Sequence, residues 1–176
     1  MMQPFQQYEV SQGKQKKKFL LGSYILQNSL KRSNDVQKFV AETCAGLEQK
    51  PWPVSEWETE AQLRAGQWLK EFGHRALPIE LMYCAKQGYG SLEQSLKECH
   101  TFNQRVTDAG LWDFHLRRPL LDGKTLCDLY EIKPGKIMKP LLEEQLKFEI
   151  LNPRASQEDC KVYMQANKAL FLAKYN

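Results

Sequence analysis

The sequence lacks any long apolar run. None of its hydrophobic stretches approaches the roughly 20 residues that a membrane-spanning helix needs. The N-terminus is polar and has no apolar segment of the kind found in signal peptides. Ten glycines and eight prolines among 176 residues are too few for a low-complexity chain. These absences predict an intracellular globular protein without a membrane partner, located in the cytoplasm or in the nucleus or mitochondrion.

Clustered metal ligands and paired cysteines are also missing. The five cysteines are dispersed, without a C-x-x-C pair: Cys44, Cys84, Cys99, Cys127 and Cys160. Such a set is typical of reduced thiols, and zinc needs ligands close together. Glu56, Glu58 and Glu60 could suggest carboxylate ligands, but side chains at i and i+2 of a helix point apart, and all three acids suit a helix N-terminus. We therefore expect no metal site and no cofactor in this chain.

The net charge of +4 is unevenly distributed. Residues 14–50 contain eight basic and three acidic residues, residues 51–116 contain six and nine, and residues 117–176 contain eleven and eight. The net charges of these three segments are therefore +5, −3 and +3. Two basic ends flank an acidic middle, so a polyanionic partner would contact the ends.

Hydrophobic spacing predicts an all-α fold. Apolar residues recur three and four positions apart, and no segment shows sustained alternation, so we predict no strands. About five helices are expected up to residue 110, at about 18–30, 34–47, 55–73, 78–88 and 91–110. Ser55 and Ser91 are expected to cap the third and fifth of these helices. We predict a mobile segment at 1–16, a helical-bundle body at 17–116 and a smaller helical tail at 117–176.

The tail contains three successive helix starts. Asp122 can cap a short helix, Pro134-Gly135 forms a tight lead into a second, and Ser156 with Asp159 resembles the capping box of a third. Basic residues surround the middle start. Because a helix N-terminus presents free N–H groups and partial positive charge, lysines beside it favour phosphate binding. Trp112 and Phe114 precede the tail and are expected to pack it onto the body, with base stacking as the alternative.

Several segments together resemble one family, the CCA-adding tRNA nucleotidyltransferases. In the tail the resemblance rests on Pro119–Leu126, Ile132–Gly135, Met138, Leu141-Leu142 and Ala155–Cys160. In the body it rests on Leu30–Asn34, Leu63–Gly73 and Leu77-Pro78. Their order and spacing resemble the C-terminal body and tail of these enzymes over roughly residues 20–170. The resemblance implies that this part grips the acceptor and TΨC arms of tRNA.

The chain departs from the family at important positions. Lys139-Pro140 replaces a family glycine, so the second tail helix should start late, with Pro140 in its first turn, or be kinked. The family's Gly-Gly-x-x-Arg-Asp, Asp-x-Asp and Glu-Asp-x-x-Arg motifs of the catalytic head and neck do not occur. Nucleotidyl transfer needs carboxylates that hold Mg²⁺. We expect no catalytic residue here; Mg²⁺ and CTP or ATP would belong to a head on another segment or chain.

The expected RNA contacts are basic residues and one glycine, because duplex RNA is recognised through phosphates, 2′-hydroxyls and shape. They are Lys133, Gly135, Lys136 and Lys139, followed by Lys124, Lys31, Arg32 and Arg154. Two alternatives remain open. Leu129, Ile132 and Pro134-Gly135 also suit a helix-hairpin-helix-like module that binds any duplex. A helical protein-interaction scaffold, with charges for solubility alone, is the other.

Overall fold

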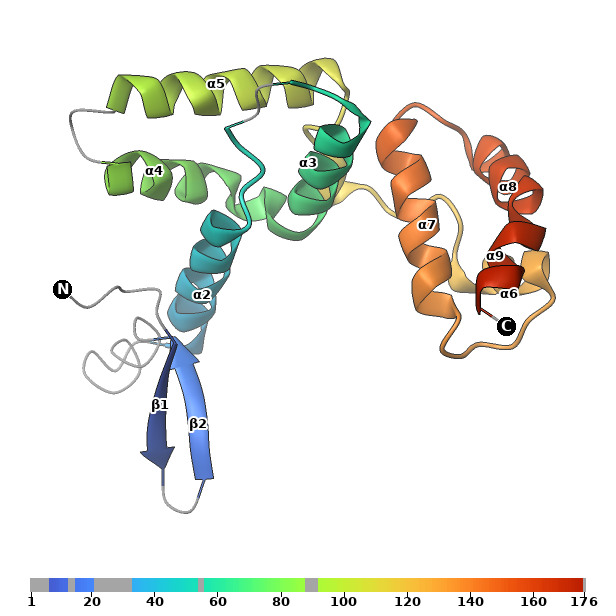
Figure 1. The fold of residues 1–176 in the computed structure, drawn as a ribbon, viewed down its shortest axis with the longest axis horizontal. Coiled ribbons are helices and arrows are strands. Elements are labelled where there is room, and N and C mark those ends of the chain that lie inside the picture. Colours follow the sequence, from blue (N-terminus) through green and yellow to red (C-terminus); the bar gives the residue numbers. More distant parts are fainter. Residues whose placement is uncertain (1–6, 13–14, 21–32, 54–55, 88–91, 176) are drawn as a thin grey trace. The chain divides into compact units, whose positions relative to one another are not determined.

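The computed structural model describes residues 7–12, 15–20, 33–53, 56–87 and 92–175 (Figure 1). The chain is predominantly helical, which confirms the all-α class. Its α-helices are α2 (Asn34–Glu48), α3 (Thr59–Phe72), α4 (Ala76–Gln87), α5 (Leu92–Asp108), α6 (Gly123–Tyr130), α7 (Met138–Leu151), α8 (Gln157–Ala166) and α9 (Lys168–Tyr175). The described residues also form the short 3-10 helices η1 (Gly73–Arg75) and η3 (Phe114–Leu116). No helix within the described ranges has the length and hydrophobicity to cross a membrane.

The N-terminal segment corrects two predictions, whereas the mobility of residues 1–16 stays a prediction. No strands were expected, and a helix was expected to start at about residue 18. Instead β1 (Gln7–Gln12) pairs with β2 (Gln15–Leu20) as an antiparallel hairpin, with Gln7 opposite Leu20 and Gln12 opposite Gln15. The apolar alternation at Tyr8 and Val10 is too short to register as a sustained period of two. The rest of the helix expected up to residue 30 lies outside the described residues.

The helix boundaries test the predicted caps. α3 begins at Thr59, and Glu58 precedes it without a side-chain cap, so the helix starts later than the predicted cap position. Ser55 and Ser91 themselves lie outside the described residues. Pro78 is the third residue of α4, which confirms its predicted place in a first turn.

The contacts divide the chain into two compact units that are not consecutive in sequence. Unit 1 comprises residues 1–50 and 74–97, and unit 2 comprises residues 51–73 and 98–176. The division of the chain into a body at 17–116 and a tail at 117–176 stays a prediction. Within unit 2, however, α3 of the expected body packs directly against α7 of the expected tail.

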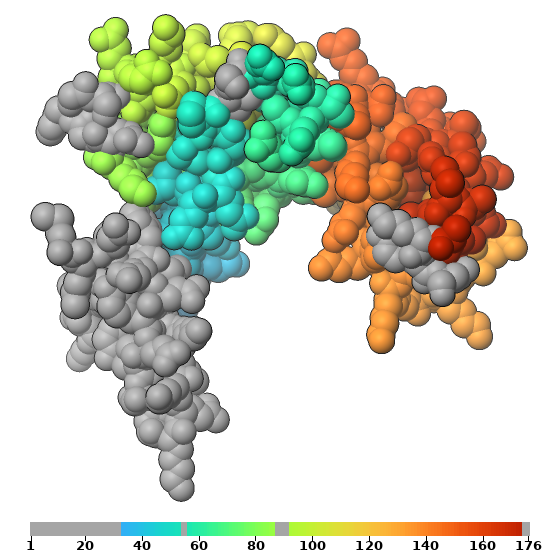
Figure 2. Space-filling view, viewed as in Figure 1, coloured from blue at the N-terminus to red at the C-terminus, as the bar shows by residue number. Residues whose placement is uncertain are grey.

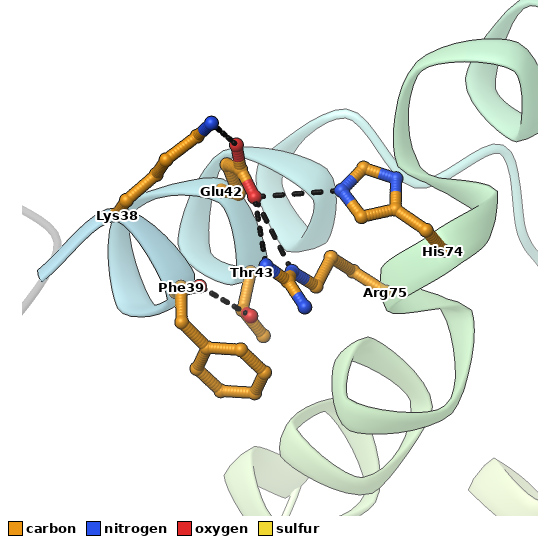
Figure 3. A network of polar contacts seen from close by, with 6 residues as sticks. All are labelled: Lys38, Phe39, Glu42, Thr43, His74 and Arg75. Carbon is orange, nitrogen blue, oxygen red and sulfur yellow. Dashed lines mark hydrogen bonds and ion pairs between the residues drawn. The ribbon is translucent and has the colours of Figure 1, made fainter. Parts of the chain in front are cut away.

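Unit 1 contains the packed helices α2 and α4, and a polar cluster joins α2 to His74 and Arg75 of η1, just before α4. The Glu42 carboxylate on α2 accepts hydrogen bonds from Arg75 Nε at 3.2 Å and contacts His74 Nε2 at 3.4 Å (Figure 3). Lys38 forms a further ion pair with Glu42 at 3.7 Å. The Arg75 guanidinium also lies 4.6 Å from the Phe39 ring centroid. Charge and ring contacts therefore join α2 to the residues that lead into α4.

Unit 2 contains two groups of buried aromatic and aliphatic side chains. Trp52 and Trp68 meet edge to face at 5.1 Å, and Phe102 of α5 lies 4.9 Å from Trp52. The second group links α6, α7, α8 and α9. It consists of Leu121, Leu126, Tyr130, Leu141, Phe148, Cys160, Met164 and Phe171. We call this second group the tail core, because it supports the three predicted helix starts.

Candidate RNA-binding surface

Two of the three predicted helix starts are capped as expected. Asp122 accepts a hydrogen bond from the Thr125 N–H at 2.8 Å, which confirms its role as the cap of α6. Bonds from the Thr125 backbone and side chain, together with the charge of Lys124, lower the pKa of Asp122 despite slight desolvation. Ser156 and Asp159 form a complete capping box at α8. The local signals at these two positions therefore suffice to start both helices.

The third start, at α7, is later than Pro134-Gly135. The helix begins at Met138, with Pro140 in its first turn, which confirms the late start predicted from Lys139-Pro140. The Met138 N–H donates to the Gly135 carbonyl at 3.0 Å, and Pro140 has no N–H. No side chain caps this end. The start of α7 thus presents fewer free donors than an ordinary helix, and its positive charge comes chiefly from lysine side chains.

The connection between α6 and α7, residues 131–137, is anchored at both ends. Ile132 and Ile137 pack partly buried against the tail core. The Ile132 N–H donates to the Cys127 carbonyl at 3.0 Å, and Lys168 of α9 donates to Glu131 at 2.7 Å. Glu131 has a left-handed backbone, with φ 57°, where the chain leaves α6. Both ends of the connection are therefore fixed, and the four residues between the isoleucines are exposed to solvent.

The lysines of this connection are exposed. Within the described ranges, neither Lys133 nor Lys136 has an ion-pair or hydrogen-bond partner, and both are classed as exposed. Lys139 lies 3.9 Å from Glu143, but its side chain is 87% exposed, so the pair neutralises little charge. Side chains of the orange segment that contains this connection project into solvent in Figure 2. We call Lys133, Lys136 and Lys139 the connection lysines.

The remaining predicted contacts are distributed unevenly. Lys124 is exposed in the first turn of α6, and this helix lies close to the start of α7, because Cys127 Sγ is 3.5 Å from Met138 Sδ. Arg154 follows the other end of α7, and a helix of 14 residues is about 21 Å long. The structure therefore places α6, which carries Lys124, next to the start of α7, and it separates Arg154 from the connection lysines by the length of α7. Lys31 and Arg32 lie outside the described residues.

Sequence patterns did not reveal what holds the connection lysines in place. The ion pair between Lys168 and Glu131 joins residues 37 positions apart, and the two isoleucines pack against the tail core, whose residues come from several helices. In the sequence, the only signal for this anchoring was that two apolar residues, Ile132 and Ile137, flank a polar turn. The lysines are therefore displayed by tertiary contacts of the tail core.

The described residues include no candidate metal site and no exposed thiol. In the part of the chain that the structure describes, no group of three or more His, Cys, Asp or Glu residues could hold a metal ion. All five cysteines are free and buried. Burial, reinforced by the charge of Glu149, raises the pKa of the Cys160 thiol to about 11, which disfavours the reactive thiolate.

Comparison with known proteins identifies one distant relative. Over 85 residues the chain is 27% identical to the tRNA nucleotidyltransferase cca2 of Schizosaccharomyces pombe (strain 972 / ATCC 24843). The match covers 48% of this chain and 18% of that protein, so the chain matches less than a fifth of the relative's length. No protein-family model and no solved structure matches the chain. The chain is therefore distantly related to a tRNA nucleotidyltransferase.

Proposed function

We propose that this chain is a tRNA-binding part of a CCA-adding tRNA nucleotidyltransferase, and that it grips the acceptor and TΨC arms during 3′-end processing. One observation carries the proposal: the connection lysines are exposed, Lys133 and Lys136 on a turn that the tail core fixes at both ends and Lys139 in the first turn of α7 that follows it. Unneutralised lysines on a fixed support suit a phosphate backbone. The distant relationship to a tRNA nucleotidyltransferase supports tRNA as the polyanion.

Catalysis is assigned to a separate part of the machinery. The sequence has no Asp-x-Asp pair, and nucleotidyl transfer requires carboxylates that hold Mg²⁺. Under this proposal a catalytic head, on another segment or another chain, supplies the metal site and binds CTP and ATP. Under the same proposal, this chain positions the tRNA. Incorporation of CTP or ATP into tRNA by this chain alone would contradict this assignment.

The test is the salt dependence of tRNA binding by the Lys133→Ala/Lys136→Ala double variant. If each lysine contacts one phosphate, the slope of log K against log salt becomes shallower by about 1.8, or about 0.9 per contact. The ratio of the tRNA affinity of the unmodified chain to that of the double variant then falls about twelvefold as the salt concentration rises from 50 to 200 mM. Fluorescence anisotropy with labelled tRNA measures both quantities.

A matched control removes two lysines that have partners. Lys147 is paired with Glu144 at 3.4 Å and Lys161 with Glu158 at 3.2 Å, so the Lys147→Ala/Lys161→Ala variant changes net charge equally. We expect its slope to stay close to that of the unmodified chain. Equal slopes for the test and control variants would reject the connection lysines as the tRNA contact. Equal affinity for tRNA and a generic DNA duplex would favour the helix-hairpin-helix-like module instead.

A further inference from the structure

Unit 2 carries an exposed tryptophan near the end of α7 remote from the connection lysines. Trp112 is 52% exposed, whereas Trp52 and Trp68 are 2% and 4% exposed. Phe114, two residues away, is buried at 1%. The expectation that both aromatics pack the tail onto the body is therefore wrong for Trp112, because the turn into η3 directs only Phe114 inward. A second large apolar side chain, Leu116, is 75% exposed beside it.

The backbone around Trp112 is firmly held. Arg117 donates to Asp113 Oδ1 through Nε and Nη2, at 3.0 and 2.6 Å. The same guanidinium donates to the Gly110 carbonyl at 2.8 Å and to the Pro153 carbonyl at 2.7 Å. These bonds enclose residues 110–117 and tie them to the segment that follows α7. Trp112 is thus an exposed ring on a preorganised support, and little further ordering is needed for it to bind a ligand.

Two arginines without partners accompany this ring. Arg154 directly follows Pro153, Arg118 directly follows Arg117, and both are exposed. Neither has an ion-pair or hydrogen-bond partner among the described residues. Of the nearby acids, Asp113 is paired with Arg117, whereas Asp159 belongs to the α8 capping box, whose hydrogen bonds lower its pKa and keep it charged. Arg118 and Arg154 are two exposed cations at this end of α7 without an ion-pair partner among the described residues.

Arg154 also borders a concavity of about 590 Å³ between the end of α7 and α8. Its lining includes the apolar residues Phe148, Pro153 and Val162, of which Val162 is 63% exposed, and the carboxylate of Asp159. A shallow, largely apolar hollow beside a guanidinium provides room for a planar group. This volume lies within the range of ordinary small-ligand sites, about 300–1,000 Å³.

We propose that this end of unit 2 binds an unpaired nucleotide of RNA, with the base stacked on Trp112 and flanking phosphates paired with Arg154 and Arg118. Aromatic rings on which bases stack, next to cations that follow the backbone, are how proteins bind single-stranded nucleic acid. Planar guanidinium groups match phosphate through two parallel hydrogen bonds. The inference rests on the proposed function and extends it: the RNA has unpaired nucleotides about 21 Å, one length of α7, from the phosphates held by the connection lysines.

The test uses the tryptophan emission of the full chain. Titration with a stem-loop RNA, or with an eight-residue oligoadenylate, should quench the emission, whereas a blunt RNA duplex should not. The Trp112→Ala substitution should abolish the quenching and weaken stem-loop binding by about 5- to 150-fold, while blunt-duplex binding is unchanged. Trp57, which is partly buried 6.5 Å from Phe102, provides the matched control, because Trp57→Phe should retain the quenching.

A second variant keeps the test decisive if Trp112→Ala disturbs the fold. The Arg118→Gln/Arg154→Gln double variant should make the salt slope for oligoadenylate shallower by about 1.4, or about 0.7 per single-strand phosphate contact. An unchanged slope, with unchanged quenching, would overturn the inference. Circular dichroism establishes that each variant retains its helix content.

The outcomes separate this inference from the proposed function. If tRNA binding depends on Lys133 and Lys136 but neither Trp112 nor the two arginines alter it, the second contact is rejected and the proposed function stands. If no RNA binds at moderate salt, both fail. If Trp112→Ala instead abolishes self-association of the chain without changing RNA binding, Trp112 is a protein contact and the inference is overturned.

Discussion

The close approach of α3 and α7 makes a quantitative prediction at Gly66. Gly66 is buried on α3, and a Cβ placed there would lie 2.5, 2.6 and 2.9 Å from three carbons of the Ile150 side chain on α7. Ile150 is fully buried, so it has little room to move. Replacing a helical glycine by alanine ordinarily stabilises by about 1 kcal/mol. Overpacking costs about 1–3 kcal/mol, and three affected carbons place this site near the upper end.

We therefore expect Gly66→Ala to lower the free energy of unfolding by about 2 kcal/mol, the overpacking cost less the helix-propensity gain. For a chain of this size the melting temperature should fall by roughly 4–8 °C. Urea unfolding followed by circular dichroism measures the change. Gly123→Ala is the matched control, because its Cβ would lie 3.6 Å from Met138 Cε, an ordinary contact. That variant should be neutral or slightly stabilised.

A double-mutant cycle identifies the cause. Ile150→Ala removes all three carbons, so adding Gly66→Ala to it should stabilise by about 1 kcal/mol instead of destabilising. The two substitutions should thus be coupled by about 3 kcal/mol. If Gly66→Ala stabilises the otherwise unmodified chain as Gly123→Ala does, α3 and α7 do not approach as described, and the packing argument is refuted.

Three further predictions concern charge, thiols and capping. Desolvation raises the pKa of Glu42, but hydrogen bonds from His74 and Arg75 together with the charge of Lys38 outweigh it and lower the pKa. The stabilisation by Glu42 should therefore be present above about pH 4.5 and decline as the pH falls through the lowered pKa, so the stability difference from Glu42→Gln, measured in urea, should be smaller at pH 3 than at pH 7. The five buried thiols should react with a disulfide reagent much more slowly in the folded chain than in guanidinium. A fast phase of thiol modification in the folded chain, with an amplitude of one thiol or more, would contradict this prediction. Ser156→Ala should destabilise by about 1 kcal/mol through loss of the α8 cap, whereas the neighbouring exposed Gln157→Ala should change stability little in the same urea assay.

Local chemistry in the sequence determined the helix starts of the tail. The Asp122 cap and the Ser156 capping box each involve residues three apart, so no distant contact is needed to form them. Pro140 likewise restricts α7 by its own covalent structure, and the helix begins late as a consequence. Periodic apolar residues identified α2 and α5, since an amphipathic face is a property of one segment. The β1–β2 hairpin escaped prediction, because its alternation is short.

Tertiary structure decided how the candidate surfaces are arranged. Trp112 and Phe114 are both aromatic and only two residues apart, yet η3 buries one and exposes the other. Basic residues expected to contact RNA lie at both ends of α7, since Arg154 follows the helix and the connection lysines precede or begin it. The sequence thus specified which residues carry charge and where helices begin. Packing between segments far apart in the chain determined which charges are neutralised and which face solvent together.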